Sequence, residues 1–88
     1  MAVINHVSVR DDATGTAKSA TINAKSISWI TNEGANTITF NFDDLVTATG
    51  AFRLPAGATI NDLDLSVSVL RYICTAGSTD FSLLGIAR

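Results

Sequence analysis

The feature that most constrains this chain is an alternation of apolar and polar residues that recurs along its length. Residues 63–69 read Leu-Asp-Leu-Ser-Val-Ser-Val, residues 37–42 read Thr-Ile-Thr-Phe-Asn-Phe, and Val7 and Val9 flank Ser8. Successive side chains of a β-strand point to opposite faces, so a period of two predicts strands with one buried face. Threonine, valine and isoleucine are frequent, and their stiff β-branched side chains favour strands.

Turn-forming residues separate the alternating runs. We predict loops at residues 11–15 and 76–78, a hairpin in which residues 32–36 join strands 26–31 and 37–42, and a type I turn at Leu54-Pro55-Ala56-Gly57. A single helical turn is expected at residues 43–46. The strands are expected near residues 2–10, 18–24, 26–31, 37–42, 45–53, 58–73 and 79–87. Several short strands with regular turns predict an all-β fold, a small antiparallel sandwich or barrel of about six to seven strands, forming one domain over residues 1–88.

Two segments depart from simple alternation. After Val69 the apolar residues Leu70, Tyr72 and Cys74 fall on the opposite face, which indicates a bulge or bend near Val69. The run from Phe81 to Ile86 is apolar on both faces, unlike a strand with one face in water. It therefore either lies centrally beneath a covering loop or presents its outer face to a neighbouring subunit.

The composition favours a domain supported by partner subunits. The chain has 88 residues, and only 16% are charged, against about 25% in an average soluble domain. Small domains bury little surface and often depend on disulfides, metals or oligomerisation, but the single cysteine, Cys74, cannot form an intrachain disulfide. We expect a homo-oligomer and assign its interface to six apolar or aromatic residues: Phe81, Leu83, Leu84, Ile86, Trp29 and Tyr72.

Charge and hydropathy weigh against two classes of partner. The net charge is −2 and the six basic residues are scattered, whereas a dedicated nucleic-acid-binding protein needs a basic face. No apolar run approaches the roughly 18–20 residues that span a membrane. The first residues, Met-Ala-Val-Ile-Asn-His, also lack the basic flank and long apolar stretch of a secretory signal.

The sequence predicts no catalytic, cofactor or metal site, and no enzymatic activity. His6 and Cys74 are the only histidine and cysteine, and nothing near either residue marks a nucleophile. The carboxylate pairs Asp11–Asp12, Asp43–Asp44 and Asp62 with Asp64 lack the spacing of a calcium loop, so we interpret them as solvated turn residues. A weak cation site shared between subunits is the alternative.

The segment at residues 51–67, Ala-Phe-Arg-Leu-Pro-Ala-Gly-Ala-Thr-Ile followed by an alternating strand, resembles a stretch found in small β-structured virion proteins of tailed bacteriophages. These proteins include capsid decoration (cement) proteins and some tail or fibre components. The resemblance implies a structural protein without a cofactor, made in the host cytoplasm and placed on the capsid exterior. It also implies an oligomer, with a trimer favoured, that contacts the major capsid protein and stabilises the assembled head. No functional residue is carried over.

The alternative is a ligand-binding β module, such as a carbohydrate-binding or host-attachment domain. Aromatic side chains that flank a groove stack on sugars or bases. This function is expected if Trp29 and Tyr72 are both exposed beside such a groove. Phe40 and Phe42 share a strand face with Ile38, which places them in the core instead.

Overall fold

The computed structural model describes residues 5–42 and 52–88, which form seven β-strands and no helix. All strand pairs are antiparallel. This confirms the predicted all-β class and number of strands. The strands are β1 (His6–Ala13), β2 (Lys18–Asn32), β3 (Ile38–Phe42), β4 (Phe52–Leu54), β5 (Thr59–Leu63), β6 (Val67–Ile73) and β7 (Thr79–Ala87).

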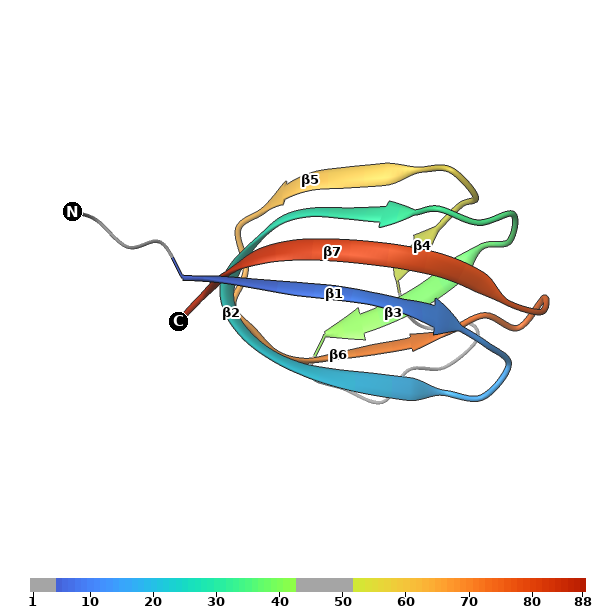
Figure 1. The fold of residues 1–88 in the computed structure, drawn as a ribbon, viewed down its shortest axis with the longest axis horizontal. Coiled ribbons are helices and arrows are strands. Elements are labelled where there is room, and N and C mark those ends of the chain that lie inside the picture. The colour runs from blue at the N-terminus through green and yellow to red at the C-terminus, as the bar shows by residue number, and fades with distance from the viewer. Residues whose placement is uncertain (1–4, 43–51) are drawn as a thin grey trace.

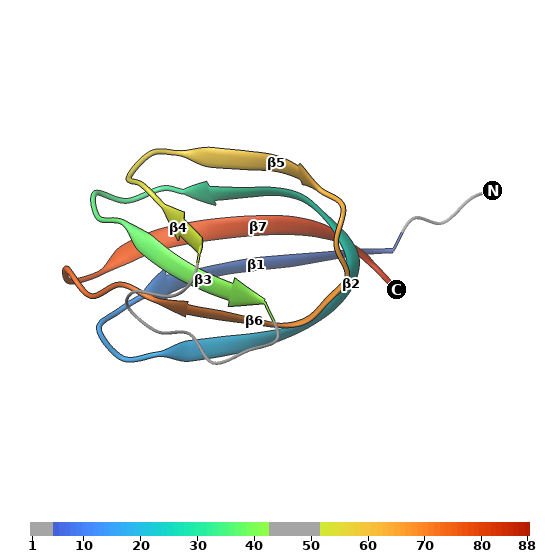
Figure 2. The same cartoon turned by 180° about the vertical axis from the view of Figure 1, so that it is seen from behind.

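The seven strands form one continuous sheet that is bent into two layers. Its order is β1-β7-β2-β6-β3-β4, and β5 also pairs with β2. One layer holds β1, β7, the second half of β2 and β5, while the other holds the first half of β2, β6, β3 and β4 (Figure 1). The view from behind shows β3 and β4 in the second layer (Figure 2). The strand β2 therefore belongs to both layers and joins them.

A bulge marks the corner at which β2 changes layer. Thr21 faces Val69 on β6, but the next recorded pair is Ala24 with Val67, so β2 has one more residue than β6 between these pairs. At this bulge Asn23 adopts a left-handed backbone conformation, with φ 46°. Asparagine tolerates this conformation better than most residues do. The irregularity expected near Val69 is present, and the extra residue lies on the partner strand.

Two further register shifts bend β2 against β7. They lie between Ala24 and Ser26 and between Ile27 and Trp29. Each shift moves the following side chains to the other face of the strand. As a result, the buried residues of β2 are spaced by two and three positions: Ile22, Ala24, Ile27, Ile30 and Asn32.

Aromatic rings from both layers fill the core at one end. Phe81 of β7 packs edge-on against Phe40 of β3, with ring centroids 5.2 Å apart, and against Tyr72 of β6 at 4.7 Å. Ile38 and Phe40 are fully buried, and Phe42 packs against the core from its partly buried position. The prediction that these three residues are core residues is confirmed.

The predicted hairpin between residues 26–31 and 37–42 is wrong. The second half of β2 already has β7 on one edge and β5 on the other, so no edge remains for β3. β3 pairs with β4 and β6 in the other layer instead. The connection at residues 33–37 therefore crosses between the layers.

Asn32 fastens this crossing connection. Its side chain is fully buried, and its amide donates to the carbonyl oxygens of Asn36 (2.7 Å) and Leu54 (3.0 Å). Its carbonyl oxygen accepts from the Gly34 backbone (3.1 Å) and the Thr79 hydroxyl (2.8 Å). A Cβ on Gly34 would lie 1.9 Å from that hydroxyl, so the close approach requires glycine. One side chain thus joins β2, β4 and β7.

Other boundaries also differ from the prediction. β1 continues through Ala13, across part of the loop expected at residues 11–15. The strand expected over residues 58–73 is divided into β5 and β6, which pair in succession with β2.

The turn after Pro55 is closed by the Ala58 backbone N–H, which donates to the Pro55 carbonyl oxygen, and Gly57 has φ 73° at its third position. The turn therefore spans residues 55–58, one residue later than predicted, and its positive φ is typical of a type II turn and not of the expected type I turn. The helical turn expected at residues 43–46 and most of the strand expected at 45–53 lie outside the described residues.

Candidate interaction surface

An apolar strip lies on the outer face of the layer that contains β1, β7 and β5. On β7, Phe81, Leu83 and Gly85 are buried, so the alternating residues Leu84 and Ile86 point outward and are partly exposed. Trp29 of β2 is partly exposed and faces Leu84 directly across the strand pair. We call Trp29, Leu84 and Ile86 the apolar strip.

Polar residues surround the strip on both sides. Across β1, Ser8 faces Leu84 and His6 faces Ile86. Across β2 and β5, Ser26 faces Ile86, and Asn61 faces Trp29. The strip is therefore a narrow apolar feature on an otherwise polar face, as expected for the centre of a contact surface with a polar rim.

The other three residues predicted for the interface belong to the core. Phe81, Leu83 and Tyr72 are 0%, 1% and 3% exposed. They pack between the two layers, so they present no surface to a partner. The prediction is corrected for these residues, and only Trp29, Leu84 and Ile86 remain at the surface.

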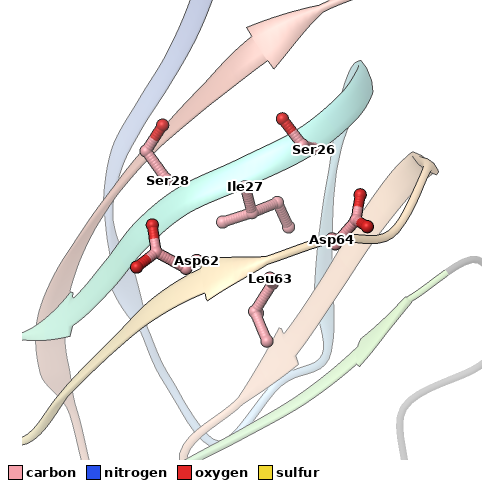
Figure 3. A pocket seen from close by; sticks show the side chains of 6 residues that line it. All are labelled: Ser26, Ile27, Ser28, Asp62, Leu63 and Asp64. Carbon is pink, nitrogen blue, oxygen red and sulfur yellow. The ribbon is translucent and has the colours of Figure 1, made fainter.

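A hollow of about 220 Å³ lies beside the strip, between β2 and β5. Ser26, Ser28, Asp62 and Asp64 point to its outer side, while Ile27 and Leu63 point the opposite way (Figure 3). Asp62 has φ 57°, an uncommon conformation for a residue other than glycine. The prediction that both aspartates are solvated turn residues holds for their exposure, but Asp62 lies within β5 and not in a turn. Their alternation with Leu63 and Leu65 was the signal that they share the outer face.

Within residues 5–42 and 52–88, the two carboxylates of the hollow form no ion pair. The ion pairs among residues 5–42 and 52–88 join Arg10 with Glu33 at 3.5 Å and Lys18 with Asp11 at 4.0 Å. Within this part of the chain, neither Asp62 nor Asp64 forms an ion pair or a side-chain hydrogen bond. The hollow therefore keeps two negative charges available.

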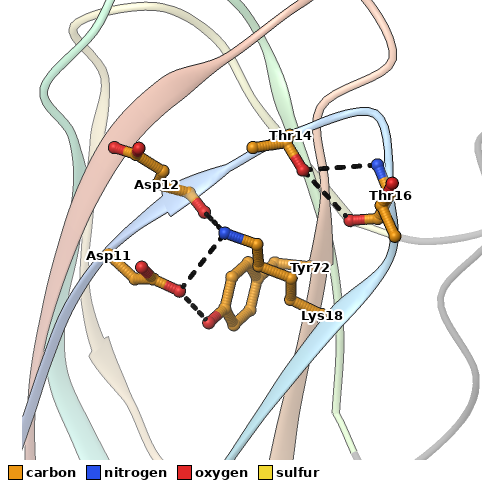
Figure 4. Close-up of polar contacts among 6 residues, drawn as sticks. All are labelled: Asp11, Asp12, Thr14, Thr16, Lys18 and Tyr72. Atoms are coloured by element: carbon orange, nitrogen blue, oxygen red, sulfur yellow. Dashed lines mark hydrogen bonds and ion pairs between the residues drawn. The ribbon is translucent and has the colours of Figure 1, made fainter.

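A second polar cluster joins the two layers at the other end of β1. The Tyr72 hydroxyl donates to an Asp11 carboxylate oxygen at 2.5 Å, and the Lys18 ammonium donates to the Asp12 backbone oxygen at 3.0 Å (Figure 4). The Tyr72 hydrogen bond lowers the pKa of Asp11. Burial, together with the same bond, raises the pKa of the Tyr72 phenol. These contacts occupy the polar end of Tyr72, so it is a structural residue and not a stacking platform.

The outer face of this end carries a pair of carboxyl groups. Asp12 of β1 faces Asp80 of β7 directly. A side-chain hydrogen bond and charge repulsion from Asp80 raise the pKa of Asp12. Among the described residues, no group of three or more histidine, cysteine, aspartate or glutamate side chains could hold a metal ion.

His6 and Cys74 are not brought together. His6 begins β1, whereas the Cys74 backbone N–H donates to the carbonyl oxygen of Thr14, just beyond the opposite end of β1. Eight residues of extended chain separate those ends by roughly 25 Å. Cys74 is also fully buried. A Cys–His pair therefore has no geometric basis.

Comparisons with known proteins add no relative. A scan against protein-family models finds no match to this chain, and a search of curated proteins finds none either. In the described part of the chain, no helix is long and apolar enough to cross a membrane.

Proposed function

We propose that this protein is a structural subunit that decorates a phage capsid and stabilises the assembled head. The observation that carries the proposal is the apolar strip of Trp29, Leu84 and Ile86 on the outer face of the β1-β7-β2-β5 layer. Exposed apolar surface that is rimmed by polar residues is typical of protein–protein interaction sites. The resemblance of residues 51–67 to small phage virion proteins supports the more specific role.

The proposed contacts have two kinds of partner. Copies of this chain associate with one another, with a trimer favoured, and the oligomer binds the major capsid protein on the exterior of the virion. The small size of the chain supports this role, because a domain of 88 residues buries little surface and gains little stability by itself. The low content of charged residues supports it as well, because few charges are available to cover a free-standing surface.

The proposed mechanism is stabilisation by mass action. A protein that binds only the assembled shell stabilises it by about 2.7 kcal/mol per site when its free concentration is a hundred times Kd. Many copies bind one shell, so modest affinity at each site adds up to resistance against the pressure of packaged DNA.

β7 offers a matched pair of variants that tests the proposal. Leu84 and Ser82 both point outward from β7, two residues apart on the same face, but only Leu84 belongs to the apolar strip. We expect Leu84→Asp to weaken self-association, measured by light scattering, and to weaken binding to stripped particles more than Ser82→Asp does. Circular dichroism checks that both variants remain folded.

The head itself provides the functional readout. Particles that lack the protein are expected to lose DNA at lower temperature or lower ionic strength than complete particles. If they keep their DNA equally well but fail to attach to host cells, the decoration role is wrong. That result would favour a host-attachment module, although burial of Tyr72 removes one of the two aromatic residues expected to flank its groove.

A further inference from the structure

We propose that the Lys18 side chain blocks the free edge of β1 and keeps the β1 strand of a second copy from pairing there. This inference does not depend on the proposed capsid role, because it rests on contacts within one chain. β1 is the last strand of its layer, and among the described strands it pairs only with β7. The unpaired backbone groups of such an edge strand can pair with a strand of another chain.

The hydrogen bonds of β1 show which of its backbone groups point to the free edge. The Asn5 carbonyl oxygen accepts from the Ala87 N–H at 3.1 Å, and these two residues continue the register of β1 with β7. Alternate residues of an antiparallel strand bond to the same neighbour, so the odd residues of β1 bond to β7. The even residues direct their N–H and C=O groups to the free edge: His6, Ser8, Arg10 and Asp12. Thr14 follows the same alternation, because its carbonyl oxygen accepts from the Cys74 N–H in the other layer at 2.8 Å.

Lys18, the first residue of β2, occupies one of these edge groups. Its ammonium donates to the Asp12 carbonyl oxygen at 3.0 Å and lies 4.0 Å from the Asp11 carboxylate (Figure 4). Asp11 is itself held by the Tyr72 hydroxyl, which donates to the same carboxylate oxygen at 2.5 Å. The position of the Lys18 ammonium is therefore fixed by two neighbouring residues of β1.

The blocked carbonyl group is one that a second β1 strand would need. Edge groups of two antiparallel β1 strands meet only where even residues face even residues, and the register centred on Val9 pairs all four even residues of each strand. In this register the Asp12 carbonyl oxygen would accept from the backbone N–H of His6 of the second copy. Lys18 already bonds to that oxygen, and two-fold symmetry places the same obstacle at the other end of the pair.

Edge protection is consistent with the rest of this layer. Natural sheets often protect an edge with a lysine, a short strand or an irregular backbone. β5, at the opposite edge of the layer, has only five residues, and Asp62 within it has φ 57°. β1 is a regular strand of eight residues, so it needs a side chain to protect it, and Lys18 is placed to do so.

The first experiment uses a synthetic peptide of residues 5–13 as the second strand. Its binding to the full-length protein is measured by fluorescence anisotropy. Lys18→Met removes the ammonium and keeps an unbranched apolar stem, whereas Lys25→Met makes the same charge change at an exposed residue elsewhere on the chain. We expect Lys18→Met to bind the peptide about fivefold more tightly than wild type, since one additional hydrogen bond can form. Lys25→Met should bind like wild type. Equal affinity of the two variants would overturn the inference.

Methylated peptides test whether binding uses the edge of β1. In the proposed register the N–H of Ser8 in the peptide points to the protein, whereas that of Val9 points away. A peptide that is N-methylated at Ser8 should lose its tighter binding to Lys18→Met, and one that is N-methylated at Val9 should keep it. If the two methylated peptides bind equally, strand pairing at this edge is wrong.

The full-length protein gives the direct readout of association between copies. We expect light scattering to show larger species for Lys18→Met than for Lys25→Met at the same concentration, and we expect the unmodified peptide to reduce their size. Circular dichroism checks that both variants keep the β fold. Equal masses for the two folded variants would show that Lys18 does not keep a second copy from this edge.

Discussion

The polar side chain of Asn32 is fully buried, so Asn32→Ala should destabilise the fold strongly. The substitution removes four hydrogen bonds. Two of them, to the Leu54 carbonyl oxygen and the Thr79 hydroxyl, are buried. A buried polar group left without a partner costs about 1–3 kcal/mol. The partly buried partners, Asn36 and Gly34, can turn to water at lower cost.

We therefore expect Asn32→Ala to lower the free energy of unfolding by about 3–4 kcal/mol. An 88-residue domain has a total of roughly 4–13 kcal/mol, so the variant should lie close to the limit of stability. Urea unfolding followed by circular dichroism measures this loss. With an m-value of about 1 kcal/mol/M, the midpoint should fall by about 3 M.

Asn36→Ala is the matched control for this prediction. Asn36 lies in the same connection, and its side chain donates one exposed hydrogen bond to the Ser78 carbonyl oxygen at 2.9 Å. Its own backbone oxygen, which Asn32 contacts, is unchanged by the substitution. The control should lose about 1 kcal/mol or less. If the two variants unfold at the same urea concentration, the reasoning about buried partners is refuted.

Two further predictions concern pH. The hydrogen bond from Tyr72 lowers the pKa of Asp11. It therefore stabilises the fold fully above the unfolded pKa of about 3.9, and this contribution is lost as pH falls through the lower folded pKa. Tyr72→Phe should lower Tm at pH 7, and the difference in Tm from wild type should shrink in acid. Asp80 raises the pKa of Asp12, so that contribution is complete below about pH 3.9 and is lost as pH rises through the folded value. Asp12→Asn should raise Tm at pH 7 relative to wild type, and calorimetry below pH 4 should find that gain gone.

The sequence predicted strands well wherever one residue of a strand faces one residue of its partner. The prediction failed along β2, because a bulge is defined by how two strands pair and is not visible in the sequence of one strand. Ile22, Ala24, Ile27 and Ile30 are all buried, but their spacing of two and three looks like a loss of alternation. The sequence therefore predicts two strands in this segment, and the predicted partner of the second strand is wrong.

The candidate surface was predictable only in part, for a related reason. Two-sided apolar character at residues 81–86 indicates a central strand, and β7 does lie between β1 and β2. The neighbouring strands decide which alternate residues of β7 face inward. The sequence alone therefore does not show that Leu83 is buried and Leu84 points outward. Tyr72 is different, because its spacing from Leu70 and Cys74 already placed it on their face, and all three are buried.

The long strand β2 also determines when this chain can fold during synthesis. Its first half pairs with β6 and its second half with β5 and β7, while among the described strands β1 pairs only with β7. The described partners of β1 and β2 emerge only after more than half of the sequence has left the ribosome, at about 5–20 residues per second. The emerging chain is thus exposed for seconds as unpaired alternating strands, and the pairing that ends this state is of the slow, non-local kind that takes milliseconds to seconds. Other copies translated nearby compete for the same strand edges during that interval, so the yield of folded protein should fall as expression rate rises.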